Sequence, residues 1–293
     1  MKHLKLFIPA ALTCVMTLSS CRAQFDNLLN STDTDMKYTA AFEYFNDGKY
    51  NKAAQIFESL SVLMNGTERD DTVQYYWGLS NYRAKDYYDA ETNFAKFIET
   101  FPRSPFTSEA SFLRIDCLYR QTYRYELDQN PTRTAIQAIN EYLVEEKTGT
   151  HRDVCNNMLK DLQQRLDKKE FENARLYYKM EDYKASRVAF KNVLKNNADN
   201  QYREDVLYYT AMSSYKYAAM SVAKKQKERY LVFVDDYYNF ISENPDSKYR
   251  RVLDVMFRRS QKALGRYSGS DDDLEEKAKD FEKMKKLLEN DKK

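Results

Sequence analysis

One recurring interval restricts the fold of this chain more than any other feature. Pairs of aromatic residues seven positions apart occur at Tyr38 and Phe45, Tyr75 and Tyr82, Phe112 and Tyr119, Phe171 and Tyr178, and Tyr208 and Tyr215. The first members of successive pairs lie 37, 37, 59 and 37 residues apart. A period of roughly 20 to 50 residues predicts an array of one repeated unit, because each unit must bury its apolar face against a neighbour.

Each repeat is predicted to contain two helices. Four of the pairs carry a small residue three positions after the first aromatic residue, namely Ala41, Gly78, Ala174 and Ala211. Three repeats continue with a run of aromatic, small and aromatic residues: Tyr50, Ala53 and Phe57; Tyr87, Ala90 and Phe94; Tyr183, Ser186 and Phe190. Offsets of three and four place such residues on one helical face. We expect the small residues where the two helices of a repeat touch, since a small side chain lets the backbones approach.

The composition favours an all-α fold class. The chain has 6 glycines and 5 prolines among 293 residues, but 25 tyrosines and 16 phenylalanines. These features are typical of tetratricopeptide repeats, helix-turn-helix units of about 34 residues that stack into a superhelix. We expect about five repeats over residues 35–265. A capping helix should follow, because the aromatic frame fails beyond Tyr249 and a terminal helix must face water.

Two connections between repeats share a proline, a serine and an aromatic residue, in the stretches Phe101–Phe106 and Asn244–Tyr249. The proline stops the preceding helix, and the serine is expected to cap the next one. The fourth repeat keeps this frame with Ala198, Asn200 and Tyr202.

The third interval, at 59 residues against 37, contains 22 additional residues. Part of the excess is expected between Leu127 and Thr132, where Pro131 stiffens the chain and Asp128 can form a local turn. This stretch either starts the second helix of the third repeat or docks a partner through Asp128 and Gln129. The second alternative rests on the tendency of loops in repeat arrays to lie on the binding face.

The N-terminus has the pattern of an export signal. Two lysines precede an apolar run at residues 6–18, and Ser19-Ser20 precede Cys21. Thirteen residues are too few to cross a bilayer, which needs ~20. We predict a lipoprotein signal peptide at residues 1–20, lipid attachment at Cys21 and a linker at residues 21–34. Since Arg22 rather than an acidic residue follows the cysteine, we predict the periplasmic side of the outer membrane.

Charge excludes one class of partner. Of 47 Lys and Arg residues, Lys2 and Lys5 leave with the signal peptide, and the remaining 45 equal the 45 Asp and Glu residues. A neutral chain without a concentrated basic patch does not predict nucleic-acid binding. Residues 266–293 form a charged tail with a thin apolar stripe, either a solvated helix or a docking helix.

No motif predicts catalysis, a metal, a cofactor or a small-molecule substrate. After the signal peptide the chain keeps one histidine, His151, four residues before Cys155. Two ligands do not make a structural zinc site, which takes four, and a thiol enzyme would need a third group that the sequence does not place. We therefore expect no enzyme. Cys117 and Cys155 could form a disulfide in an oxidising compartment or remain buried thiols.

The remaining route to function is protein binding by the surface of the array. In tetratricopeptide arrays the first helices line the concave face, and aromatic and arginine side chains concentrate at interface hot spots. The candidates are Tyr38, Phe42, Phe45, Tyr75, Leu79, Tyr82 and Arg83. The same recurrence is also expected of residues that form the core between helices, and packing explains Arg83 least easily.

Taken together, these motifs resemble the BamD family of outer membrane assembly lipoproteins. The resemblance rests on the lipobox cysteine, the repeats, the Phe101–Phe106 turn, the Leu127–Thr132 stretch and the segment Lys169–Ser186. It covers nearly the whole chain after the signal peptide. Two departures are Ala198, where the family has proline, and the tail after Tyr267, for which there is no counterpart.

The resemblance implies a subunit of the β-barrel assembly machinery. Such a subunit binds the barrel-forming component and is thought to receive unfolded outer membrane proteins. The alternatives are another tetratricopeptide lipoprotein, in cell-envelope coordination or glycan uptake, and a thiol enzyme using Cys155 and His151.

Overall fold

The computed structural model describes residues 24–146 and 150–266. The predicted signal peptide, Cys21 and nearly all of the charged tail lie outside these residues. Within the described residues the chain is helical and contains no strand. None of the described helices is both long and apolar enough to cross a membrane.

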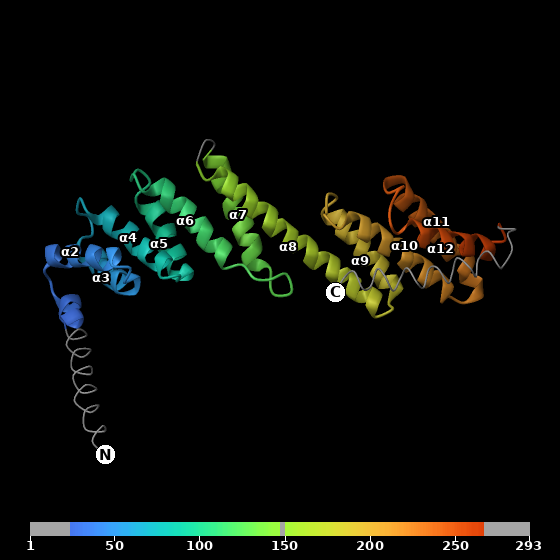
Figure 1. Ribbon diagram of the computed structural model, residues 1–293, viewed down its shortest axis with the longest axis horizontal. Coiled ribbons are helices and arrows are strands. Elements are labelled where there is room, and N and C mark those ends of the chain that lie inside the picture. The colour runs from blue at the N-terminus through green and yellow to red at the C-terminus, as the bar shows by residue number, and fades with distance from the viewer. Residues whose placement is uncertain (1–23, 147–149, 267–293) are drawn as a thin grey trace, which may run out of the picture. The chain divides into compact units, whose positions relative to one another are not determined.

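The helices follow the repeat frame (Figure 1). They are α2 (Thr34–Asn46), α3 (Tyr50–Leu63), α4 (Asp70–Arg83), α5 (Tyr87–Thr100), α6 (Thr107–Arg120), α7 (Asn130–Glu145), α8 (Arg152–Lys179), α9 (Tyr183–Asn196), α10 (Arg203–Ala219), α11 (Ala223–Glu243) and α12 (Arg250–Ala263). Every predicted aromatic pair lies on the first helix of a repeat, and every second run lies on the following helix. The predicted tetratricopeptide fold class, five helix pairs and a terminal α12, is confirmed in the described residues.

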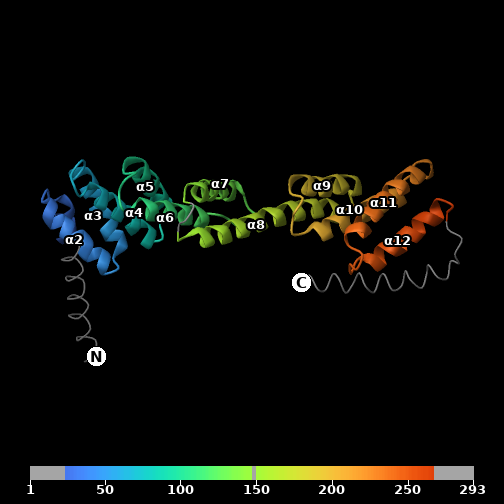
Figure 2. The same ribbon diagram turned by 90° about the horizontal axis from the view of Figure 1, so that it is seen from above.

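The chain divides into two compact halves, residues 1–160 and 161–293, with the boundary inside α8. Within each half, each helix packs on its neighbours in the chain, as Figure 2 shows from above. The N-terminal half has apolar clusters around α2–α4 and α4–α6, and the C-terminal half has clusters around α8–α10 and α10–α12. Successive helices therefore share one apolar face after another, as a repeat array requires.

Small residues lie inside the packed helices as predicted. Ala41 and Ala211 have no exposed surface, and Ala174 is also buried. At Gly78, a Cβ atom would lie 2.9 Å from Cε1 of Phe94 on the other helix of the repeat. The α4 backbone thus approaches α5 closely enough that only glycine fits without displacement.

The serine of each connection does not cap the next helix. Phe106 and Tyr249 occupy the N-cap positions and have no side-chain cap. Instead, Ser104 Oγ accepts from the Phe106 N–H at 3.3 Å and donates to Asp71 at 2.8 Å. Ser247 Oγ accepts from the Tyr249 N–H at 3.0 Å and donates to Glu204 at 2.6 Å. The serine thus stabilises the turn and links it by a hydrogen bond to the first helix of the preceding repeat, α4 or α10.

The additional residues of the third interval lie mostly outside the predicted stretch. The α6–α7 connection has nine residues where the α4–α5 connection has three. Helix α7 has 16 residues and α8 has 28, whereas α4 and α5 have 14 each. Most of the excess is therefore an extended first half of α8. Sequence reasoning missed it because its buried residues, among them Leu162, continue a helical pattern without aromatic rings.

The predicted linker is structured where it is described. Residues 24–30 form a helix, and Phe25 is buried against Tyr44 with ring centroids 5.5 Å apart. The ammonium of Lys37 donates to the Leu29 carbonyl at 2.7 Å and to Ser59 at 2.6 Å, and burial lowers the pKa of Lys37. These contacts attach the described part of the segment to α2 and α3.

Candidate protein-binding site

The first aromatic residue of every pair packs against the turn that enters the next repeat. The stacked pairs are Tyr75 with Phe106 at 4.5 Å, Phe112 with His151 at 3.7 Å, Phe171 with Tyr202 at 4.8 Å and Tyr208 with Tyr249 at 4.0 Å. In the first repeat the guanidinium of Arg69 takes this position, 4.8 Å from the Tyr38 ring centre. These stacking contacts hold the connections between repeats against the first helices.

In four repeats the second aromatic residue packs against the second helix of its own repeat, at the first residue of α3, α5 and α9 and inside α11. The pairs are Phe45 with Tyr50 at 5.4 Å, Tyr82 with Tyr87 at 5.8 Å, Tyr178 with Tyr183 at 5.4 Å and Tyr215 with Tyr230 at 5.9 Å. Their rings are edge-on or tilted, the geometry that aromatic quadrupoles favour. Both members of the pairs therefore have a structural use.

Most of the predicted binding residues belong to this packing. Tyr75 is buried, and Tyr38, Phe42 and Phe45 are partly buried against the first apolar cluster, as Leu79 is against the second. The ring of Phe42 lies 4.7 Å from that of Tyr76. The structure thus places these rings between helices, which is the core alternative of the sequence analysis.

Tyr82 combines packing with a buried hydrogen bond. Its hydroxyl donates to the Asp116 carboxylate at 2.7 Å, and Asp116 also binds Arg120. Burial raises the pKa of Tyr82 to about 12, and the hydrogen bond to Asp116 acts in the same direction. Arg83, the next residue, is exposed at the end of α4.

The two other candidates, Asp128 and Gln129, both lie in the α6–α7 connection, but one is exposed and the other is buried. Gln129 is 4% exposed, and its amide donates to the carbonyls of Arg124, Leu127 and Asp128 at 2.9, 3.0 and 3.2 Å. Its oxygen accepts from Thr132 at 2.9 Å. Gln129 therefore holds the loop together from inside, while Asp128 is exposed and its carboxylate accepts only a 3.3 Å bond from the Asn130 N–H.

The same connection displays apolar surface that the sequence analysis did not single out. Tyr123 and Leu127 are each 50% exposed. A loop fixed by an internal glutamine and carrying exposed apolar side chains has the character of a pre-organised docking element. We name Tyr123, Leu127 and Asp128 the corner surface.

His151 and the two cysteines are structural. His151 replaces the turn aromatic of the third repeat, and its Nε2 lies 3.1 Å from Glu109. Cys117 and Cys155 are buried free thiols; burial raises the pKa of Cys117 to about 12 and also raises the pKa of Cys155. Thiols held protonated are poor nucleophiles. No group of three His, Cys, Asp or Glu side chains able to hold a metal occurs in the described residues.

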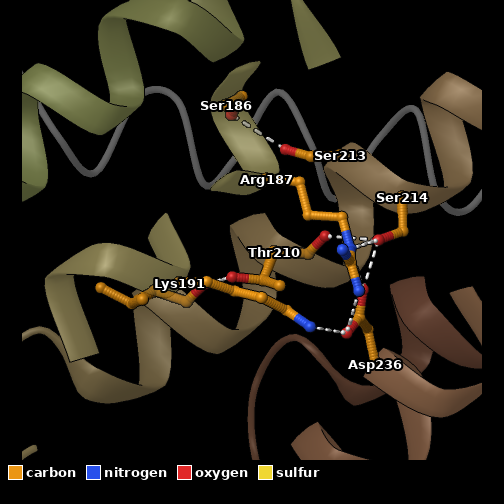
Figure 3. A network of polar contacts seen from close by, with 8 residues as sticks. Ser186, Arg187, Lys191, Thr210, Ser213, Ser214 and Asp236 are labelled. Atoms are coloured by element: carbon orange, nitrogen blue, oxygen red, sulfur yellow. Dashed lines mark hydrogen bonds and ion pairs between the residues drawn. The ribbon is translucent and has the colours of Figure 1, made fainter. Parts of the chain in front are cut away.

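A buried polar cluster joins α9, α10 and α11 (Figure 3). Asp236 is 7% exposed, and its carboxylate binds Arg187 at 2.7 and 3.1 Å and Lys191 at 3.2 Å. The Ser214 hydroxyl also contacts Asp236 and accepts from Arg187 at 2.8 Å. We call these four residues the Asp236 cluster. Sequence reasoning missed it, because only register between repeats brings its members together.

A stacked array of helix pairs joined by packed turns is the class that the fold defines, a tetratricopeptide-repeat array. A family model described as YfiO, outer membrane lipoprotein, matches residues 31–231. The chain belongs to this family of outer membrane lipoproteins. No curated protein matches the chain.

Three solved structures are similar in part. The TPR2AB-domain:pHSP90 complex of yeast Sti1 has 14% identity and a TM-score of 0.42, covering 88% of this chain and 96% of that one. A tetratricopeptide repeat protein from Parabacteroides merdae has 11% identity and a TM-score of 0.33, covering 80% and 75%. The P58(IPK) TPR domain has 12% identity and a TM-score of 0.38, covering 89% and 67%.

Proposed function

We propose that this chain is a lipid-anchored, periplasmic scaffold subunit of the β-barrel assembly machinery, with its lipid on Cys21. Membership of an outer membrane lipoprotein family supports a location at the outer membrane. The lipobox-like residues before Cys21 support lipid attachment at that cysteine. The partners are the barrel-forming component and unfolded outer membrane proteins, as the resemblance to the BamD family implies.

The corner surface is the observation that carries the proposal. Docking requires exposed side chains in a fixed geometry, because ordering a loop on binding costs affinity. Gln129 fixes the loop, and Tyr123, Leu127 and Asp128 lie on its outside. Tyrosine is enriched among residues that dominate binding energy. We assign the barrel-forming component to this surface.

The test is recovery of membrane proteins with the tagged chain after mild detergent extraction. We expect Tyr123→Ala and Asp128→Ala together to lose the barrel-forming component while the melting temperature stays unchanged. Gln129→Ala should lower the melting temperature, because three carbonyls and the Thr132 hydroxyl lose their partner. Asn140→Ala, at an exposed position on α7, is the matched control.

Two outcomes decide against the proposal. Recovery of the barrel-forming component with the double variant at wild-type yield removes the corner surface from the interface. Recovery of a different envelope complex, or of none, from the unmodified chain contradicts the role in barrel assembly. The anchor is tested separately by Cys21→Ala, which should release the chain from the outer membrane fraction.

A further inference from the structure

A polar groove on the N-terminal half occupies the position that the Asp236 cluster occupies on the C-terminal half. It lies among α3, α4 and α5, has a volume of about 440 Å³ and is lined by nine residues, including Gln55, Glu58, Trp77, Asn81 and Asn93. We call it the Trp77 groove. It falls wholly within residues 1–160, the first compact half.

The two sites correspond residue by residue in the repeat frame. Asn81 is the twelfth residue of α4, and Ser214 is the twelfth residue of α10. Asn93 follows Tyr87 by six residues, as Asp236 follows Tyr230, and both tyrosines pack on the second aromatic residue of the preceding helix.

The cationic positions differ between the two sites. Ala54 and Glu58 stand fifth and ninth in α3, where Arg187 and Lys191 stand in α9. The carboxylate of the Asp236 cluster is thus replaced by an amide in the Trp77 groove, and its two cations are replaced by alanine and glutamate.

The exchange leaves polar groups of the N-terminal half without partners. Asn81 is 9% exposed, and its carboxamide makes no hydrogen bond to the described chain. The Nδ2 of Asn93 and the Oγ of Ser80 are buried and also unpaired. In the C-terminal half the counterpart of Ser80, Ser213, is paired with Ser186 at 2.9 Å. Of these three residues, Asn81 and Asn93 line the groove, and a ligand bound there would supply the hydrogen-bond partners that their amides lack in the described residues.

The lining chemistry defines the class of ligand. None of the nine lining residues is a lysine, arginine or histidine, while Glu58 and Asp89 are carboxylates, so the groove offers an anion no positive charge. Its amides donate and accept hydrogen bonds, its carboxylates accept them, and the Trp77 indole supplies an apolar surface. Ligand pockets of ~300 to 1,000 Å³ combine apolar surface with a few convergent polar groups. We infer that the Trp77 groove binds a neutral saccharide.

A peptide fits this lining less well. Peptide-binding grooves provide successive pockets for apolar side chains, whereas Trp77 and Ala54 are the only apolar lining residues here. Ring hydroxyls of a saccharide match the density of amides and carboxylates, and its C–H face matches the indole.

Trp77 provides the measurement, because it is the single tryptophan of the chain. Cellobiose, diacetylchitobiose and maltose are titrated into the full protein, and tryptophan fluorescence is recorded. We expect a saturable change with at least one disaccharide. Asn81→Ala and Asn93→Ala should each weaken its binding about tenfold, the effect of one lost hydrogen bond to a buried group. Asn140→Ala on α7 is the control and should bind normally.

A second variant separates binding from folding. Ala54→Arg with Asn93→Asp installs the counterparts of Arg187 and Asp236, and it should close the groove, abolish binding and preserve the melting temperature. The inference is wrong if none of the three disaccharides changes the fluorescence of the folded protein. It is equally wrong if binding survives the closing variant, or if a lysine-rich peptide binds at this site and the disaccharides do not.

Discussion

The Trp77 groove and the Asp236 cluster are two versions of one position in the repeat. In the C-terminal half, a carboxylate on α11 meets an arginine and a lysine on α9 and a serine on α10, and all four side chains satisfy one another. In the N-terminal half, amides and an alanine stand in the corresponding places and leave a groove. A repeat array can thus convert a stabilising contact into a recognition site by side-chain exchange alone.

Each of the two sites lowers the stability or the adaptability of its own half in a different way. A buried charged group requires its partners, so the Asp236 cluster restricts α9, α10 and α11 to one arrangement. Unpaired amides in the Trp77 groove reduce stability but remain available to a ligand.

Alkaline unfolding should have the largest effect and should act on both halves. Burial raises the pKa of Tyr82 to about 12 and that of Tyr237 further, and each phenol donates to a carboxylate, Asp116 or Asp254. In the unfolded chain tyrosine has a pKa of ~10. Folding therefore favours the neutral phenol, and its stabilisation is complete below pH ~10 and is lost as the pH rises towards 12.

Two signals distinguish the halves in this titration. Circular dichroism reports the helices of the whole chain, and Trp77 fluorescence reports the N-terminal half. We expect both signals to change cooperatively above pH ~10. Native helicity retained well above pH 12 would show that these phenols ionise without loss of packing.

Removing the carboxylate of the Asp236 cluster should cost about 2 kcal/mol of unfolding free energy, because the partly buried Arg187 loses its charged hydrogen-bond acceptor. The variant is Asp236→Ala, measured by urea unfolding. Asp235→Ala is the control, since Asp235 is the exposed neighbour and a surface substitution changes stability by about 0.5 kcal/mol or less. Equal effects for the two variants would remove the cluster as a source of stability.

The sequence predicts the array because the information is local and periodic. The aromatic pair Tyr75 and Tyr82 defines the first helix of a repeat, and Gly78 marks its close approach to the second. The roles of these residues are harder to predict, since a recurring ring serves a core and a groove equally well in one dimension. Their stacking on turn residues such as Phe106 decides the matter, and it depends on three-dimensional contacts.

The polar sites were beyond sequence reasoning for a related reason. Asp236 and Arg187 lie 49 residues apart, and nothing in a chain rich in charge distinguishes them. Comparison of equivalent positions in the repeats could have found them: Asn81 and Ser214 share a register that the aromatic frame already fixes. The sequence contains this correspondence, and it becomes visible once the repeats are aligned on their tyrosines.

The helix contact beside the Trp77 groove can be tested at its glycine. Gly78→Ala adds ~1 kcal/mol of helix propensity, yet the new Cβ would lie 2.9 Å from the fully buried Phe94 ring. We expect a net loss of about 1 to 2 kcal/mol, since overpacking a closed site forces its neighbours to shift.

A double-mutant cycle with Phe94→Leu identifies the clash, because the two changes should be non-additive when the ring is the obstacle. Additive effects in urea unfolding would place the strain of Gly78→Ala elsewhere. The equivalent position in α10 is Ala211, which already carries a methyl group without exposed surface. The cycle therefore measures the free energy of coupling between position 78 and the Phe94 ring.

The smallest effect is expected at His151, where a histidine stands in the position that phenylalanine or tyrosine takes in the second, fourth and fifth repeats. Its ring stacks on Phe112 at 3.7 Å with 7° between the planes, while its contact with Glu109 is partly exposed. An aromatic pair contributes ~0.5 to 1.5 kcal/mol beyond its buried area. His151→Ala should therefore lose about 1 kcal/mol, and His151→Phe should retain wild-type stability within about 0.5 kcal/mol. Equal losses in the two variants, measured by urea unfolding, would assign the stability to the Glu109 contact and exclude His151 from the stacking series formed by Phe106, Tyr202 and Tyr249.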